Sequence, residues 1–484
     1  MSPYVCGAKV AVVGAAVSAL FVAKELSRLA PYVEVTIFCD TDRLPGDGAS
    51  ARNQKTVHRL GNYYLATATD ATSAVRKANA LAEDAAQLLG WIARANAFVG
   101  RRRGAIIALD REANDLIRER FDLVGRAAIP YEDIAQLRTA RTGVAAYESG
   151  DLTYDIFRLA NFLGAQLTAS GHRILFNAPV DAVTRSGRVY VRERQGHQLV
   201  AWDRGGMRNV VASRHGWFED FDVVVLAAGI GIPRIGGDWR DGSDLMFQTF
   251  QAGGFRYPLG DYRPYSADVA YSVARRDETD ALGTFWALNV DPSEGPETSM
   301  CLNEFTALWH DAKMPLPHRL GAAQMSLLAR ALVQDVGRAQ ADQWAAQGAM
   351  QPFECAKLNV WRVGERHEAR NTDVSVYSAG SRVAVVYSGK ATHATTTGRK
   401  GAELIVEMLE CSDYAATVAR DAPWSLPPTA TCIAEATVTA IDDDGFHNVW
   451  RGSSLEGNLL ASALELEDDV GPELCSAVKR WLAA

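Results

Sequence analysis

The chain opens with a short apolar run that meets a glycine and then takes up a helical pattern. Residues 10–13 are continuously apolar, Gly14 follows, and from Leu20 onward apolar residues recur at helical spacing. This order predicts a buried strand, a tight turn and a helix. A second apolar run, residues 33–38, predicts the next strand and ends close to Asp40. The pattern therefore predicts the opening βαβ unit of a dinucleotide-binding α/β domain.

The predicted turn departs from the glycine-rich fingerprint of such domains. That fingerprint has glycine at three places, whereas this chain has Gly14, Ala16 and Ala19. The N–H groups at the start of the helix can hold a pyrophosphate, but alanine at the second place puts a methyl group where the backbone must approach the phosphate. Taken alone, this loop is a weak indication of dinucleotide binding. The expected cofactor contacts here are Gly14, Ala15, Ala16, Val17 and Ser18, with Asp40 on a ribose hydroxyl.

Two later strand-to-glycine turns support the same fold independently. Residues 223–226 form an apolar run that leads into Ala227, Ala228 and Gly229, as in a buried parallel strand that stops beneath a ligand. Near the other end, strands are predicted at residues 374–377 and 383–387. Gly389 and a hydroxyl-rich stretch follow them, before a helix predicted at residues 402–409. This second helix start is also suited to binding an anion, although an ordinary cap has the same composition.

The middle of the chain alternates between helical and strand periods. Helical periodicity predicts a long surface helix at residues 71–94, and a strand is expected at 104–109. We interpret the later short strands and helix as an antiparallel sheet that forms a roof over the cofactor, where the substrate sits. Helical patterns are also expected at residues 111–140 and 320–346, and strands at 246–250, 269–273 and 284–290.

Composition narrows the class of protein. A chain of 484 residues exceeds what one core usually serves, so two or three domains are expected. The net charge of −8 argues against nucleic acid as a partner. Seven cysteines, scattered singly, favour a reduced, cytoplasmic protein, and no apolar run reaches the length of a membrane span. Residues 10–23 lack the positive flank of a secretory signal. No metal-ligand spacing is present.

A polar stretch after the second predicted strand carries the most specific signal. Its hydroxyl, amide and cationic side chains are suited to phosphate, and the tyrosines Tyr63 and Tyr64 follow it. The stretch resembles the D-amino-acid oxidase-like superfamily of FAD-dependent oxidoreductases, in particular the branch that contains glycerol-3-phosphate dehydrogenase and 2-hydroxyglutarate oxidase. Members carry a Ser-x-Arg-Asn/Ser stretch, then a histidine, a glycine and paired tyrosines. The residues that match are Ser50, Arg52, Asn53 and His58, while Gly61 and the tyrosines come one residue late.

The resemblance implies FAD as the cofactor and assigns residues to it. His58 would lie beside the flavin; it is covalently attached in some relatives, although non-covalent FAD is the expectation here. A helix-end histidine bonded to a carbonyl is the competing interpretation. With Ala16 in the loop, Ser18 and the donors at residues 50–53 would carry more of the pyrophosphate contact. The further cofactor-binding residues implied are Ser50, Ala51, Arg52, Asn53, Val180, Ala228, Gly229, Gly389, Lys390, Ala391 and Thr392.

The fold class expected is α/β: a Rossmann-like FAD-binding domain with an inserted α+β substrate domain and a C-terminal helical appendage. The FAD-binding domain would comprise residues 1–80, 150–240 and 356–410. The substrate domain would comprise residues 81–149 and 241–355. The proline-marked segment from residue 411 to 484 would cap the substrate domain or mediate self-association into a homo-oligomer.

The predicted reaction is oxidation of a C–N or C–O bond by hydride transfer to flavin N5. The substrate would be a small, anionic amine, amino acid or 2-hydroxy acid. Arg362, in a stretch that also holds Arg366 and Arg370, is the expected anion clamp, and His58 is the expected flavin-side histidine. Lys390 and His393 are further catalytic candidates. A flavin monooxygenase and a non-catalytic binding or assembly subunit are the alternatives; Lys390 after the late glycine argues against the first.

Overall fold

The computed structural model describes most of the chain, and the account below concerns those residues. They are 7–46, 55–67, 71–99, 104–131, 144–192, 196–210, 216–218, 220–258, 267–275, 281–291, 295–310, 322–363, 374–411 and 470–483.

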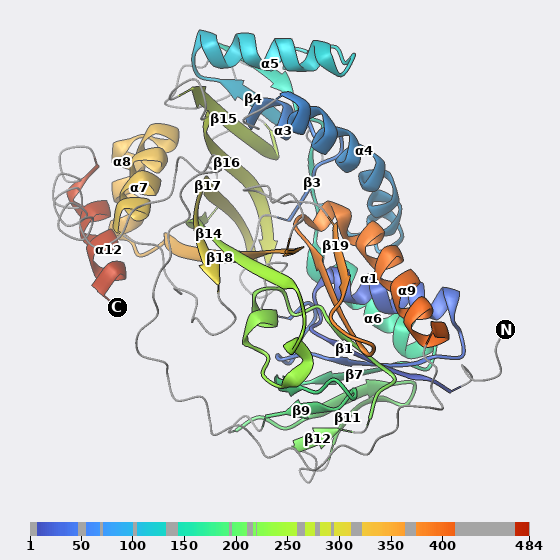
Figure 1. Ribbon diagram of the computed structural model, residues 1–484. Helices are drawn as coiled ribbons and strands as arrows, with labels where there is room; N and C mark the ends of the chain where they lie inside the picture. Colours follow the sequence, from blue (N-terminus) through green and yellow to red (C-terminus); the bar gives the residue numbers. More distant parts are fainter. Residues whose placement is uncertain are drawn as a thin grey trace.

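A mixed sheet with a parallel centre forms the first body of the fold (Figure 1). Its strand order is β11-β10-β7-β2-β1-β13-β20-β19. The run from β7 to β20 is parallel, and the outer strands pair in the antiparallel sense. The strands are β1 (Lys9–Val13), β2 (Glu34–Phe38), β7 (Arg173–Phe176), β10 (Val200–Asp203), β11 (Gly206–Asn209), β13 (Val223–Leu226), β19 (Val374–Ser378) and β20 (Val383–Ser388).

Both faces of this sheet are covered, which explains why its central strands are apolar throughout. Val10 and Val12 of β1 pack against the helices α1 (Val17–Leu29), α6 (Ile156–Ala169) and α9 (Ala394–Cys411). Ala11 and Val13 point to the opposite side, into a second cluster beneath a three-stranded sheet. That small sheet has the order β12-β9-β8, with β8 at Val180–Val183, β9 at Val189–Val191 and β12 at Gly216–Phe218.

A second large sheet lies beside the first body, with the order β18-β14-β17-β16-β15-β4-β5 (Figure 1). It is antiparallel, as expected, except where β15 pairs with β4 in the parallel sense. The expected strand at residues 104–109 is thus an inner strand of this sheet. The members are β4 (Ala105–Ala108), β5 (Ala145–Glu148), β14 (Leu245–Pro258), β15 (Val269–Arg275), β16 (Ala281–Asp291), β17 (Gly295–His310) and β18 (Gln351–Arg362).

Helices cover this second sheet in two groups. One group consists of α3 (Asn62–Thr67), α4 (Ala71–Arg94) and α5 (Arg111–Leu123), which share a core with β4 and β15. The other consists of α7 (Ala322–Val336), α8 (Arg338–Ala346) and α12 (Pro472–Ala483). The C-terminal helix therefore packs on α7 and α8. Short elements complete the fold: β3 (Thr56–Val57), β6 (Leu152–Thr153), and the 3-10 helices η3 (Gly229–Arg234), η4 (Asp238–Arg240) and η5 (Ala391–His393).

Three expected helices differ in extent from the sequence prediction. The helix predicted at residues 320–346 is two helices, because Gly337 takes a positive φ of 86° between α7 and α8. The helix expected from residue 402 instead begins at Ala394. The threonines at residues 395–397, which precede the expected start, therefore belong to its first turns. The helical pattern at 111–140 gives α5, which ends at Leu123; residues 132–143 lie outside the described part.

Candidate functional site

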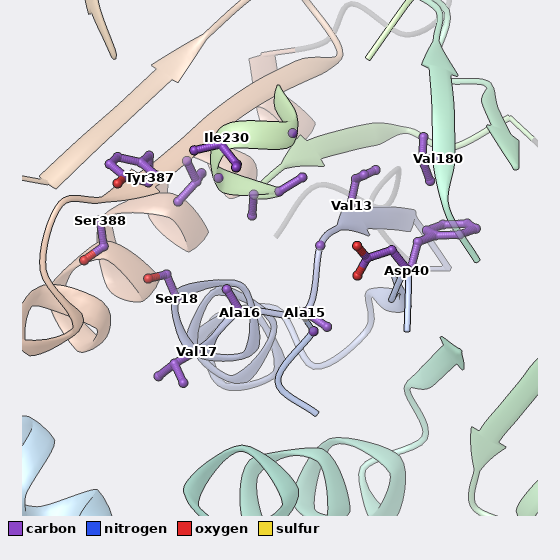
Figure 2. A pocket seen from close by; sticks show the side chains of 18 of the residues that line it. Val13, Ala15, Ala16, Val17, Ser18, Asp40, Val180, Ile230, Tyr387 and Ser388 are labelled. Carbon is purple, nitrogen blue, oxygen red and sulfur yellow. The ribbon is translucent and has the colours of Figure 1, made fainter. Parts of the chain in front are cut away.

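A cavity of about 410 Å³ lies at the carboxyl ends of the parallel strands of the first sheet. This is where open α/β sheets bind ligands. Figure 2 shows the start of α1 with Asp40 and Val180 to one side and Tyr387 and Ser388 to the other. Segments far apart in the sequence meet there. The predicted residues that line the cavity are Gly14, Ala15, Ala16, Val17, Ser18, Asp40, Val180, Ala228, Gly229, Gly389 and Ala391.

The turn between β1 and α1 requires glycine at its first place only. Gly14 has a φ of +105°, and a Cβ there would lie 2.7 Å from the carbonyl oxygen of Ala227. Ala16 is the N-cap of α1 with φ −67°, an ordinary conformation for alanine. The N-cap makes no side-chain hydrogen bond, and the first turn of α1 has no acidic residue. The substituted loop thus keeps a helix start that is compatible with an anion.

Two polar side chains of the cavity wall lie on segments that the opening motif does not include. Tyr154 is 1% exposed, and its hydroxyl has no hydrogen-bond partner among the described residues. Its burial raises the pKa of this phenol above the usual value, so the hydroxyl stays protonated and can donate. Lys55 is 2% exposed, with Nζ 5.1 Å from the ring centroid of Phe157. A buried donor and a buried cation in one cavity suit a large anionic ligand with polar groups along its length.

His58 lies outside the residues that line this cavity, in a buried group beside its Gly389–Ala391 end. Its backbone N–H donates to Thr392 Oγ1 at 3.1 Å, and its Nδ1 lies 3.1 Å from Asp151 Oδ2. The hydroxyl of Tyr271 also donates to Asp151 Oδ2. Burial, followed by the Asp151 carboxylate, raises the pKa of Tyr271 well above its usual value. The competing expectation, a histidine bonded to a backbone carbonyl, is not what the structure shows for Nδ1.

Lys390 and His393, on either side of residues 391–392 in the sequence, contact different partners. Lys390 Nζ lies 5.3 Å from the ring centroid of Tyr63 and 5.5 Å from that of Tyr64, within cation–π range. His393 Nδ1 instead contacts Asp84 of α4, which also accepts from Thr396 Oγ1. Burial alone would raise the pKa of Asp84, but the His393 and Thr396 hydrogen bonds hold it below the usual value. In this placement Lys390 adjoins the aromatic group, whereas His393 ties η5 to α4.

Arg362 lies apart from the cavity. Its guanidinium donates to Asp244 Oδ1 at 3.2 Å and to the Ser378 carbonyl at 3.0 Å. It lines a separate polar hollow together with Arg185 and Arg382. This placement does not favour Arg362 as an anion clamp at the flavin. Arg366, His367 and Arg370, and the donors Ser50, Ala51, Arg52 and Asn53, lie outside the described residues.

The structure adds residues to the candidate set that sequence reasoning did not single out: Asp151, Tyr154, Tyr271 and Asp84. Only Asp151 had a local signal, because it follows Gly150 in a short polar stretch. The others sit in ordinary strand or helix patterns, and only the tertiary fold brings them to the site.

The fold and its cavity define a dinucleotide-binding α/β protein with a second sheet beside the cofactor domain. Residues 9–345 match the family model described as FAD dependent oxidoreductase. Because these residues make up more than half of the 484 in the chain, the chain belongs to this family of FAD-dependent oxidases and dehydrogenases. The family resemblance expected from the polar stretch around His58 is thereby confirmed.

Solved structures give the same fold. Glycine oxidase from Geobacillus kaustophilus superposes with a TM-score of 0.53 at 12% identity, covering 83% of this chain and 95% of that one. NikD, an unusual amino acid oxidase essential for nikkomycin biosynthesis, gives 0.53 at 13% identity, with 83% and 94% covered. No curated protein sequence gives a significant match.

Within the described part of the chain, no helix is both long and apolar enough to cross a membrane. The same residues bring together no group of three or more histidine, cysteine, aspartate or glutamate side chains suited to a metal ion.

Proposed function

We propose that the protein binds FAD in the cavity at the carboxyl ends of the parallel strands and oxidises a C–N or C–O bond of a small anionic substrate. The observation that carries this proposal is the convergence of distant segments, from Asp40 to the Gly389–Ala391 turn, on one cavity. An extended dinucleotide is a ligand that would contact all of them at once.

We assign the residues in and beside the cavity to different parts of FAD by their position along it. Asp40 would bind a ribose hydroxyl, and Val180 would contact the adenine. The helix start at Gly14, Ala15, Ala16, Val17 and Ser18 would hold the pyrophosphate, with Lys55 and the Tyr154 hydroxyl as additional partners from the cavity wall. Ala228 and Gly229 would lie beneath the ligand, and Gly389, Lys390, Ala391 and Thr392 would adjoin its flavin end. FAD, when bound, supplies the acceptor for a hydride.

His58 is proposed to face the flavin end from the side of the second sheet. Its ring stacks on Tyr63 with centroids 5.6 Å apart and its Nδ1 contacts Asp151 Oδ2, while its backbone N–H donates to Thr392 Oγ1. These contacts already engage one face and the Nδ1 of the imidazole, and non-covalent FAD is the form that we propose. Release of the flavin into the supernatant after acid precipitation tests this point, because a flavin attached at His58 would stay with the protein.

The test of the function is direct. The purified protein should be yellow, or should become so after incubation with FAD, and the colour should bleach anaerobically on adding an oxidisable substrate. A colourless protein that FAD does not reconstitute would contradict the proposal and would favour a binding or assembly role. Oxygen uptake that depends on NAD(P)H would favour a monooxygenase instead.

A further inference from the structure

A buried group of three side chains lies where β15 of the second sheet meets the turn before β6, beside the late turn of the cavity. Asp151 is fully buried, His58 is 5% exposed and Tyr271 is 1% exposed. His58 Nδ1 and the Tyr271 hydroxyl both contact Asp151 Oδ2, and they lie 3.3 Å from each other. They come from three segments: the residue after β3, the turn before β6, and β15. Asp151 Oδ1 has no hydrogen-bond partner among the described residues.

These contacts decide which ring nitrogen of His58 carries the proton. An ionised carboxylate only accepts hydrogen bonds, so an ionised Asp151 pairs its Oδ2 with an Nδ1–H of His58. Tyr271 donates to the same oxygen and so reinforces the carboxylate as acceptor. Neutral His58 therefore keeps its proton on Nδ1, and the lone pair of the ring lies on Nε2. A carboxylate placed this way also stabilises the imidazolium that forms when Nε2 takes up a proton.

A positive charge lies close to this group. Lys390 sits between Gly389 and Ala391, two residues of the cavity wall, and its ammonium lies over the rings of Tyr63 and Tyr64. Tyr63 in turn stacks on His58 and lies 4.6 Å from Tyr271, centroid to centroid. An oriented histidine and a cation thus share one aromatic group next to the Gly389–Ala391 end of the cavity. A cation there attracts a substrate anion and repels a substrate ammonium.

We infer that the substrate is an anionic alcohol, with a carboxylate or phosphate near the carbinol carbon, and that Asp151 is a positioning residue that makes His58 its base. This inference rests on the proposed function. The carbinol loses a hydride to FAD, its two-electron oxidant, and its hydroxyl proton to Nε2 of His58, and its C–O single bond becomes a C=O double bond.

The need for a base distinguishes the oxidation of an alcohol from the oxidation of an amine. A carbinol hydroxyl holds its proton tightly near neutral pH, so its oxidation gains from a base oriented at the hydroxyl. A neutral amine already has a lone pair that can assist departure of the hydride, so it needs no such base. The Asp151–His58 couple and the Lys390 ammonium would therefore serve the first substrate class.

Matched substrates test the class. The FAD-loaded protein is mixed anaerobically with both enantiomers of lactate, malate and 2-hydroxyglutarate, with glycerol 3-phosphate, and with alanine, aspartate and glutamate, which share carbon skeletons with the hydroxy acids. Bleaching by an alcohol but by none of the amino acids supports the inference, and the responding alcohol tells whether the anion is a carboxylate or a phosphate. Bleaching by an amino acid, or by no alcohol, overturns it, while the yellow colour shows independently whether FAD binds.

Variants test the role of Asp151 without relying on turnover alone. Nitrogen NMR of the histidine-labelled protein, without substrate and with His58 assigned through His58→Gln, should show the Nδ1–H tautomer in wild type. Asp151→Asn should disturb this tautomer and slow flavin reduction about 100-fold, with FAD affinity within about twofold of wild type. Tyr271→Phe, which keeps the Asp151 carboxylate, should keep the tautomer and lose less than about fivefold in rate. An Nε2–H tautomer in wild type, or an unchanged reduction rate in Asp151→Asn, would refute the role.

Discussion

Replacing Gly14 by alanine tests the one place in the opening turn where glycine is sterically required. The added Cβ would lie 2.7 Å from the Ala227 carbonyl oxygen and 2.8 Å from two further backbone atoms of Ala227 and Ala228. These are backbone atoms of the turn after β13, so no side chain can rotate away from them. The residue also has φ +105°, which alanine adopts only under strain.

The free-energy cost of Gly14→Ala follows from the strained φ and the close backbone contacts. A non-glycine residue in such a conformation costs on the order of 1–3 kcal/mol, and overpacking of a close contact costs about 1–3 kcal/mol more. We therefore expect a total near 3 kcal/mol. If the turn keeps its shape, the cost falls on folding stability; if the turn shifts, it falls on FAD binding, where about 3 kcal/mol is roughly a 100-fold loss in affinity.

Both quantities are measurable on the same protein. FAD affinity is followed by the quenching of flavin fluorescence, and stability by the urea unfolding midpoint without cofactor. The matched control is Gly125→Ala, because Gly125 also has a positive φ of 63° but has nothing within 4 Å of an added Cβ. The control should lose about 1 kcal/mol of stability and no FAD affinity. If Gly14→Ala matched wild type in both measurements, the steric reasoning would be wrong.

Three further predictions concern single side chains. Tyr154→Phe should weaken FAD binding about fivefold in calorimetry, because it removes one buried donor of the cavity, whereas Tyr32→Phe, away from the cavity, should not. Asp84→Asn should lower the thermal midpoint by an amount corresponding to about 1 kcal/mol, with the exposed neighbour Glu83→Gln as control. The pKa of Asp84 is lower in the folded protein than its unfolded value of about 3.9. The contribution of the Asp84 carboxylate to stability is therefore present above the unfolded pKa and is lost as the pH falls through the folded pKa. A stability difference between wild type and Asp84→Asn that stayed constant down to pH 3 would contradict this. Burial raises the pKa of the Cys39 thiol to about 11, so its alkylation in native protein at pH 8, followed by peptide mass spectrometry, should be at least about 100-fold slower than in guanidinium; equal rates would refute it.

Many residues that line the cavity could be predicted from sequence, because they belong to strand ends and turns. A buried parallel strand has a continuous apolar sequence, and the turn that follows it lies at the carboxyl edge of the sheet, where ligands bind. This is why Gly14, Asp40, Gly229 and Gly389 could be named from local patterns and are found around one cavity. The same logic did not reveal that Ala16 is conformationally ordinary, since sequence alone does not give a φ angle.

The polar and charged groups outside the cavity could not be predicted in this way. Arg362 looked like an anion clamp because arginines cluster around it, yet its guanidinium is held by Asp244 and Ser378 away from the cavity. Asp151 and Tyr271 are separated by 120 residues, and nothing in either local sequence announces a shared hydrogen bond. Their meeting depends on how β15 of the second sheet packs against the turn before β6.

The sequence by itself thus determined the fold class and the strand ends that surround the cavity, because both depend on short-range periodicity and turn chemistry. The family was indicated by the resemblance of the polar stretch around His58. The tertiary structure alone decided which ionisable groups touch: His58 with Asp151, His393 with Asp84, and Lys390 with the two tyrosines. The physical reason is range. A strand or a turn is specified by neighbours along the chain, whereas a hydrogen bond between buried side chains is specified by the packing of whole sheets and helices against one another.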